Sequence, residues 1–314
     1  MSSETLTVPE ALAGKRLDQA LAAMFPQYSR SRLKSWLLDG AVLVDGEKWK
    51  PRDPVHGGET VQLEAVEDVQ VRSAPESMTL DIAFEDDHLL IVNKPAGLVV
   101  HPGAGNPGGT LMNGLLAHHP GLENLPRAGI VHRLDKETSG LLLVGKTLEA
   151  HTALTRLLAD RDISRRYQAV VNGVLTGGGT IDAPIARHPV DRTRMSVQDN
   201  GREAVTHYTV AERFRAHTLV DVKLESGRTH QIRVHFAWRR HALLGDPVYG
   251  GRLALPKGAS EPLIDALRQF RRQALHAVRL AFEHPMTGDE VDVKAPLPDD
   301  LQTLLETLRT DARA

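Results

Sequence analysis

An arginine and a carboxylate, Arg133 and Asp135, stand two positions apart in the stretch GIVHRLDKETSG. If this stretch is extended, both side chains point to one side, while His132 and Leu134 point to the other. Leu134 can then be buried while the opposite side presents a cation and a carboxylate to a cleft, as a catalytic site requires. Glycines at both ends let the backbone turn sharply or approach a ligand closely. The alternative is a plain ion pair at the end of a strand, which contributes little by itself.

Two further stretches add an aromatic ring and a high density of arginine. SRRYQAVVNG places Tyr167 on an expected strand directly after two arginines, which suits a base that stacks and a phosphate that pairs. Core packing with a solvated hydroxyl is the alternative for this tyrosine. ESGRTHQIRVHFAWRRH contains four arginines, among them Arg228 and Arg233. One of these directed at Asp135 would hold that carboxylate charged in a partly buried cleft.

Several other chemistries lack the residues that they need. The chain has no cysteine, which excludes disulfides, thiolate metal sites and cysteine nucleophiles. His230 and His235 are five apart, off a common helix face, and no H-E-x-x-H motif is present, so a zinc site is not expected. The segment GAGNPG, residues 103–108, formally matches G-x-G-x-x-G. Pro107 removes an amide where a phosphate would need one, however, and we interpret the segment as an ordinary loop.

The formal net charge of the 314 residues is −2, which by itself does not suggest a nucleic-acid partner. The charge is unevenly distributed, with 14 Lys and Arg against 8 Asp and Glu in residues 161–240, and 3 against 8 in residues 283–314. Local asymmetry of this kind, rather than the total, decides which partners a surface attracts. A solvated surface of mixed charge is the alternative interpretation of the same numbers.

The length of the chain favours two domains. Residues 66–79 are polar and lack periodicity, which predicts a linker. We therefore divide the chain into residues 1–75 and residues 76–314. There is no signal-peptide pattern at the N-terminus and no apolar run long enough to span a bilayer, so we expect a cytoplasmic protein.

The first domain reads as two short helices and a small sheet. Helical spacing of apolar residues covers residues 16–25 and the stretch RSRLKSWLLD, which Ser29 can cap. AVLVDGEKW reads as two strands around Asp45-Gly46, a strong hairpin signal. Arg30 and Lys34 share one face of the second helix, where plain solvation is the alternative to binding a polyanion.

The second domain mixes strands and helices without regular repetition, which predicts an α+β fold rather than a series of βαβ units. The expected helices are TLMNGLLAHH and LEAHTALTRLLAD, in the second of which Leu148, Leu154, Leu157 and Leu158 are among the apolar positions. The expected strands are HLLIVNKP, GLLLVGKT, RRYQAVVNG, HTLVDVKLE and EVDVKAP.

At these positions the sequence resembles a known family. GIVHRLDKETSG is similar to the active-site motif of the RluA class of pseudouridine synthases. IVNKPAGLVVHPG, RRYQAVV, GRTHQIRVH and LLGDPVYGG resemble the other signatures of that class and occur in the same order. The first 65 residues resemble the S4 RNA-binding module. The resemblance covers nearly the whole chain, and it implies a largely antiparallel mixed sheet in the catalytic domain.

The resemblance also implies roles for individual residues. Asp135 matches the essential aspartate, and Arg233 matches the basic partner that keeps it charged and oriented. Tyr167 matches the tyrosine that stacks on the uracil. Arg133 matches an arginine that fills the gap left by a flipped nucleotide. In the S4-like module, Arg30, Arg32 and Lys34 would contact phosphates, as would Arg228 in the catalytic domain.

The reaction that the resemblance implies converts uridine to pseudouridine and needs no cofactor and no metal. The details are most similar to enzymes that modify uridines in a 23S rRNA stem-loop, helix 69, so we expect 23S rRNA or a large-subunit precursor as partner and a monomeric protein. Whether the aspartate attacks C1′ or acts as a base stays open. Two alternatives also stay open: a related synthase for another rRNA or tRNA uridine, and a noncatalytic ribosome-associated RNA binder.

Overall fold

The computed structural model describes residues 2–26, 28, 30–65, 74–103, 105–191 and 193–313, with the backbone alone for residues 2, 3, 30–32, 35 and 65. The chain separates into two compact units, residues 1–72 and residues 73–314. The linker was predicted for residues 66–79; residues 66–73 lie outside the described residues, as does Ser29, the predicted helix cap.

The N-terminal unit packs two helices on a three-stranded antiparallel sheet with the strand order β1-β3-β2. Its elements are β1 (Ser2–Thr7), the short 3₁₀ helix η1 (Glu10–Leu12), α1 (Leu17–Met24), α2 (Arg30–Asp39), β2 (Val42–Val44) and β3 (Thr60–Ala65). Both predicted helices are confirmed. Their apolar residues Leu17, Leu21, Leu33 and Trp36 are buried together in one core, which gives this unit a hydrophobic centre of its own.

The predicted hairpin around Asp45-Gly46 is only half right. The turn is present, with positive φ at both residues, as a tight hairpin turn of this kind requires. The second strand was wrong: Val44 and Glu47 form a single bridge across the turn, but no described strand continues from it, and β2 pairs with β3. Pro51 and Pro54 lack amide donors and interrupt any longer strand there.

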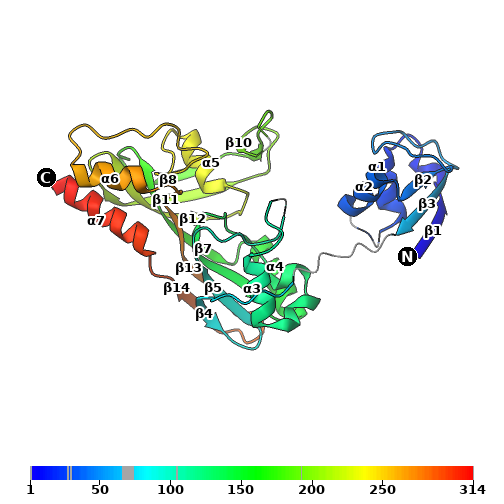
Figure 1. The fold of residues 1–314 in the computed structure, drawn as a ribbon, viewed down its shortest axis with the longest axis horizontal. Coiled ribbons are helices and arrows are strands. Elements are labelled where there is room, and N and C mark those ends of the chain that lie inside the picture. Colours follow the sequence, from blue (N-terminus) through cyan, green and yellow to red (C-terminus); the bar gives the residue numbers. More distant parts are fainter. Residues whose placement is uncertain are drawn as a thin grey trace. The chain divides into compact units, whose positions relative to one another are not determined.

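The C-terminal unit is built on a nine-stranded sheet with the order β4-β5-β6-β13-β7-β12-β11-β8, while β14 pairs with β13 (Figure 1). Among the described strands of this sheet, β6 and β13 form the one parallel pair, so the predicted largely antiparallel α+β fold is confirmed. The strands are β4 (Ile82–Glu85), β5 (Leu89–Lys94), β6 (Ser139–Gly145), β7 (Ser164–Asn172), β8 (Gly179–Asp182), β11 (Val205–Arg213), β12 (His217–Leu224), β13 (Leu275–Glu283) and β14 (Glu290–Lys294). A separate hairpin joins β9 (Ile185–Arg187) to β10 (Met195–Val197).

Helices cover both faces of this sheet. They are α3 (Leu111–His118), α4 (Leu148–Asp160), α5 (Gln231–Trp238), α6 (Glu261–Gln269) and α7 (Asp299–Arg313), together with the 3₁₀ helices η2 (Pro120–Asn124) and η3 (Pro126–Gly129). The face that carries Tyr167 and Val171 packs against α3 and α5. The opposite face, which carries Val170, packs against α6 and α7, drawn in orange and red in Figure 1.

The sequence predictions for α3, α4 and five of the strands are confirmed. Within α4, Leu154 is buried as expected, but Leu148 is 54% exposed. Leu148 is the first residue of the helix, directly after the cap Thr147, and lies on the solvent side of the first turn, in which Ala150 is buried. No helix in the described part of the chain is both long and apolar enough to cross a membrane.

Candidate active site

A cavity of about 760 Å³ in the C-terminal unit contains the predicted catalytic residues. Its walls come from the loop before β6, the start of β7, and the loop between β12 and α5. Six arginines line it against two acidic residues, Asp135 and Glu225; the arginines are Arg127, Arg133, Arg161, Arg165, Arg228 and Arg233. The cavity therefore favours an anionic ligand.

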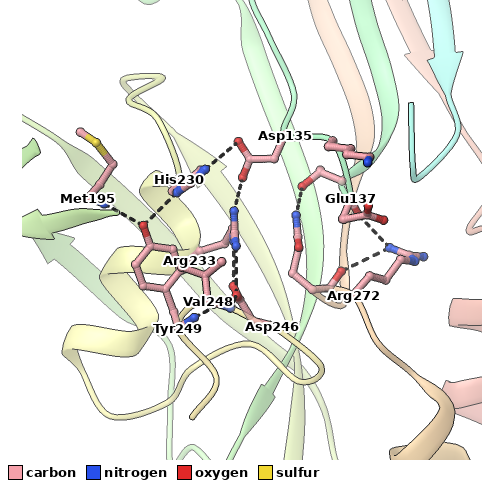
Figure 2. A network of polar contacts seen from close by, with 12 residues as sticks. Asp135, Glu137, Met195, His230, Arg233, Asp246, Val248, Tyr249 and Arg272 are labelled. Carbon is pink, nitrogen blue, oxygen red and sulfur yellow. Dashed lines mark hydrogen bonds and ion pairs between the residues drawn. The ribbon is translucent and has the colours of Figure 1, made fainter. Parts of the chain in front are cut away.

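Asp135 lies in the loop before β6 and faces this cavity, with 17% of its side chain exposed (Figure 2). Its Oδ2 accepts a hydrogen bond of 2.9 Å from Nη1 of Arg233. Its Oδ1 is 3.8 Å from Nε2 of His230. The segment is a loop, not the strand that we considered. Leu134 is buried and Arg133 lines the cavity as predicted, but His132 and Leu134 border the cavity too, so the residues do not alternate between two sides.

The loop that carries Asp135 is fixed from several sides. Nζ of the fully buried Lys94 donates to the carbonyl oxygen of Lys136 as well as to those of Pro95 and Leu98. Burial lowers the pKa of Lys94 to about 8. On the far side, Nε2 of Gln273 donates to Oγ1 of Thr138, and Nε2 of His132 accepts from the amide of Leu143. Burial lowers the pKa of His132 to about 3, so the imidazole stays a neutral acceptor.

Two glycines bring this loop close to the sheet. Gly129 and Gly140 have φ values of 76° and 110°. A Cβ on Gly129 would lie 2.0 Å from the carbonyl oxygen of Gly145, and one on Gly140 would lie 2.3 Å from that of Ala277. Only glycine therefore fits at either end of the stretch, which explains both flanking glycines.

Arg233 is held between two carboxylates. Its Nε and Nη2 donate to Oδ2 and Oδ1 of Asp246 at 2.7 and 3.0 Å, which leaves Nη1 for Asp135. Burial alone would lower the pKa of Arg233, but the hydrogen bonds and charges of Asp246 and Asp135 outweigh burial and raise it. Burial would likewise raise the pKa of Asp246, but Arg233 and two backbone amides lower it. The guanidinium therefore stays charged and has one orientation.

His230 and Tyr249 complete this network, as Figure 2 shows. The hydroxyl of Tyr249 accepts from the amide of Met195 at 2.9 Å and lies 2.8 Å from Nδ1 of His230. Its own hydrogen is then free for Nδ1, which leaves the Nε2 hydrogen of His230 facing Asp135. Burial lowers the pKa of His230, so this imidazole is neutral at pH 7.

Tyr167 lines the same cavity from β7 and is 6% exposed. Burial raises the pKa of its hydroxyl, and the charge of Asp135 acts in the same direction. Its ring also packs in the core that includes Leu134 and Ile232. Both interpretations of this residue thus hold together: the ring is part of the core, and the phenol, neutral at pH 7, borders the cavity beside Asp135.

Arg165 is a cavity residue that we gave no role of its own from the sequence. It precedes Tyr167 by two positions on β7, so both side chains point to the same face of the sheet. Its side chain is buried, and its Nε has no hydrogen-bond partner among the described residues. One contact is a long hydrogen bond of 3.3 Å from Nη2 to the carbonyl oxygen of Glu225.

The other predicted RNA-contacting residues are distributed over both units. Arg133 and Arg228 line the cavity, and Nε of Arg228 donates to the carbonyl oxygen of Glu203. Lys34 is exposed on α2 in the N-terminal unit. The side chains of Arg30 and Arg32 lie outside the described part of the structure.

The described residues include no group of three or more His, Cys, Asp or Glu placed to hold a metal ion. The GAGNPG segment is a loop before α3, and Ala104 within it lies outside the described residues. The amide of Gly109, directly after this segment, donates to the carboxylate of Glu76. In a phosphate-binding turn such an amide would donate to the ligand, but here it donates to the carboxylate of Glu76.

Comparison with known proteins assigns this architecture. The model for RNA pseudouridylate synthase matches residues 88–238, which include Asp135, Tyr167 and Arg233. The model for the S4 domain matches residues 15–61. Ribosomal large subunit pseudouridine synthase D of Xanthomonas campestris pv. campestris is 56% identical over 97% of this chain and 92% of its own length. The chain belongs to the RNA pseudouridylate synthase family. It is therefore a pseudouridine synthase.

Other members of the family agree with this assignment. Ribosomal large subunit pseudouridine synthase D of Escherichia coli K12 is 54% identical over 98% of this chain and 94% of its own length. The solved structure of human RNA pseudouridylate synthase domain containing 4 matches with a TM-score of 0.58 and 27% identity, over 73% of this chain and 92% of that one. Because the chain is an enzyme of this family, the noncatalytic alternative is set aside.

Proposed function

We propose that this synthase isomerises uridine in 23S rRNA, in the helix 69 stem-loop, with Asp135 as the essential catalytic residue. The observation that carries the proposal is the pairing of Asp135 with Arg233 at 2.9 Å inside a cavity lined by six arginines. The relatives named as synthases of the large ribosomal subunit support this class of RNA. We propose further that the protein acts as a monomer in the cytoplasm.

The reaction breaks the bond between C1′ and N1 of the uridine and forms a bond between C1′ and C5. The proton on C5 leaves to solvent and N1 gains one, so the product is an isomer of the substrate. Asp135 faces the developing positive charge at C1′, as carboxylates do in glycosidases. It acts either as a nucleophile at C1′ or as a base on the sugar.

Three residues assist Asp135 in this proposal. Arg233 aims one oxygen of the carboxylate and pairs its charge. Tyr167 lies against the uracil, and its neutral hydroxyl is available to manage the proton on C5. Arg133 fills the space that the target base leaves in the RNA stack, which offsets part of a flipping cost of a few kcal/mol.

The remaining arginines bind the backbone of the RNA. Arg165 is buried beside Tyr167 with an unpartnered Nε, so a phosphate or a uracil oxygen would satisfy it. Arg228 lines the same cavity. Arg30, Arg32 and Lys34 of the S4 unit contact phosphates and add affinity that falls with salt.

The test uses an rRNA stem-loop fragment tritiated at C5 of its uridines. Wild-type protein should release tritium to water, and Asp135→Asn should release it about a thousandfold more slowly or not at all. Asp162→Asn, which neutralises an exposed carboxylate of the same unit, should behave like wild type. Equal release by wild type and Asp135→Asn would contradict the proposal.

A related synthase that modifies another rRNA or tRNA uridine is the second candidate, because the family assignment does not depend on one RNA. Mapping of pseudouridines in cells that lack the gene separates the two. Loss confined to helix 69 supports the 23S rRNA substrate, and loss elsewhere supports the second candidate.

A further inference from the structure

A second pocket, of about 540 Å³, lies at the C-terminal end of α5. It is bordered by the loop after β7, by Tyr208 of β11 and by the last residues of α5 with the turn that follows. Its lining residues are Leu175, Thr176, Gly177, Gly178, Tyr208, Trp238, Arg239, Arg240 and His241. None of them is acidic.

This pocket and the active-site cavity border the same face of the sheet. Tyr167, Leu175 and Tyr208 all pack in or against the core beneath α5. The active-site cavity contains residues at the start of α5, among them Arg233, and the second pocket contains residues at its end. Five residues of helix from Arg233 to Trp238 span about 7.5 Å, and the eight-residue helix about 12 Å. An RNA strand that leaves the active site can therefore reach the second pocket.

Trp238 is the aromatic residue of this pocket that solvent reaches most. Its side chain is 53% exposed, and it is the only exposed residue among the Trp, Tyr and Phe side chains that the structure describes. The guanidinium of Arg239 lies 6.0 Å from the centre of its ring. An exposed indole beside arginine is the usual arrangement for stacking an unpaired base.

Arg240 occupies a position where glycine is strongly preferred. It follows the C-cap of α5 with a φ of 64°. The amide of Arg240 donates to the carbonyl oxygen of Ala237, and that of His241 donates to Phe236, which together form a Schellman motif. An arginine in the left-handed conformation is less stable than glycine there, so stability of the helix does not account for it.

The arginines of this pocket are also free of carboxylates. Neither Arg239 nor Arg240 forms a side-chain hydrogen bond or an ion pair with another described residue, and both are exposed. Two unpaired cations beside an exposed indole have the composition of a site for a single-stranded nucleotide segment.

We propose that this pocket is a second RNA-binding site, in which Trp238 stacks on an unpaired base of the substrate and Arg239 and Arg240 pair with the neighbouring phosphates. This inference rests on the proposed function in one respect, which is that the bound RNA is the substrate of the enzyme. The RNA segment is one that flanks the target uridine at a distance of about 10 to 20 Å.

The test measures turnover and binding with the tritiated stem-loop, extended by single-stranded flanks. Trp238→Ala should raise KM between about 5-fold and 100-fold, because stacking on an aromatic ring is worth that much per base, while kcat stays unchanged. Trp238→Phe keeps a ring and should stay near the wild-type KM. Arg239→Ala with Arg240→Ala should make the slope of log affinity against log salt shallower by about 1.4, since each phosphate contact with a single strand contributes about 0.7.

The matched control for charge is Arg268→Ala with Arg271→Ala, which removes two exposed arginines on and after α6. It should leave KM and the salt slope unchanged. Arg240→Gly should raise the melting temperature by about 2 to 4 °C, because glycine suits the helix end, and should still raise KM. If Arg240 served only folding, a variant with a higher melting temperature would not also have a higher KM.

The inference would be overturned if wild type, Trp238→Ala and the Arg239→Ala, Arg240→Ala double variant had equal KM values. It would also be overturned if the Arg268→Ala, Arg271→Ala control changed KM and the salt slope as much as the pocket variant. If Trp238→Ala does not fold, tryptophan fluorescence of wild type and Trp238→Phe is compared during titration with RNA. RNA should quench a part of the wild-type emission that Trp238→Phe lacks. Identical quenching in the two proteins would overturn the site. The other two tryptophans, Trp36 and Trp49, lie in the N-terminal unit. Wild-type protein that releases no tritium would contradict the proposed function instead.

Discussion

Arg233 can orient Asp135 only because Asp246 already holds two of its three nitrogens. A buried guanidinium without that second carboxylate would be free to rotate about its side chain and would leave part of its charge uncompensated. Asp246 is fixed in turn, because its Oδ1 accepts from the amides of Val248 and Tyr249. The orientation of the Asp135 carboxylate therefore depends on a residue that does not border the cavity.

Asp246→Asn should lower kcat by about 10-fold to 100-fold with little change in KM, because it disturbs the orientation of Arg233 and not the RNA contacts. It should also cost about 3 kcal/mol of unfolding free energy, since one partner of a buried ion pair loses its charge. Steady-state tritium release and urea unfolding measure the two effects. Asp292→Asn is the control for kcat, because it breaks a similar two-point pair, with Arg279, that joins β13 to β14 and has no contact with the loop of Asp135 among the described residues. An unchanged kcat in Asp246→Asn would show that Asp246 does not position the site.

The sequence indicated several residues that line the cavity but not His230, which faces Asp135, nor the residues behind Arg233. Arg133, Asp135 and the arginines after β12 stand out by charge density and by their resemblance to family motifs. Asp246 and Tyr249 stand in LLGDPVYGG, which contributed to the resemblance but suggested no partner. Asp246 lies 13 residues after Arg233, and only the fold shows that the two side chains meet.

At the scale of elements, a helix or strand is predicted most readily where one of its sides is apolar and buried and the other is polar and exposed. α4 was predicted with its boundaries because one side faces solvent and the other carries Ala150 and Leu154. α5 was missed because nearly every residue from Gln231 to Phe236 is buried, polar ones included, so no amphipathic period appears. The long strand β13 was missed although it forms the centre of the sheet, between β6 and β7. The first three residues of β13, from Leu275 to Ala277, are all buried, and the register shifts between Ala277 and Arg279, so no single alternation runs through the strand.

Gly227, in the loop between β12 and α5, offers a test of the role of Arg165. A Cβ on Gly227 would lie 2.7 Å from Nη1 of Arg165, so Gly227→Ala must displace that guanidinium. If Arg165 binds the RNA, Gly227→Ala and Arg165→Ala should each raise KM by about 10-fold, the value of one charge-assisted hydrogen bond. The double variant should be no worse than Arg165→Ala alone, because both changes remove the same contact. Additive effects in this double-mutant cycle would contradict the contact.

At the scale of the whole molecule, the two units have separate cores. The N-terminal core contains Leu17, Leu33 and Val61, and the catalytic unit surrounds a sheet that is covered on both faces. Because helices cover both faces, some polar residues of the strands are buried, imidazoles among them. His217 on β12 and His276 on β13 are 4% and 1% exposed. Burial lowers the pKa of each to about 4.

These two histidines predict how the stability of the catalytic unit depends on pH. In the unfolded chain an imidazole binds its proton near pH 6.5, but in the folded protein it does so only near pH 4. The unfolded state therefore holds more protons between these values, and folding loses stability as the pH falls from 6.5 towards 4. Each histidine contributes about 1.4 kcal/mol per pH unit in that window, or about 3 kcal/mol across it. Carboxylates with lowered pKa, such as Asp246, act only below this window, near pH 4 and under.

Urea unfolding at half-unit steps from pH 7.5 to 4.5 measures this dependence. The free energy of unfolding should be nearly constant above pH 7 and fall steeply near pH 5.5, where these two histidines together contribute about 3 kcal/mol per pH unit. His101 and His132, whose pKa values burial lowers to about 4 and about 3, add to the fall in the same direction. His276→Gln removes one titrating group while keeping a polar side chain near Ser139, so it should reduce the slope by about 1.4 kcal/mol per pH unit. A slope that is the same in His276→Gln and in wild type would mean that His276 is not buried in its neutral form. The packing of β13 against β6 would then differ from the arrangement described, because His276 sits at their one parallel pairing.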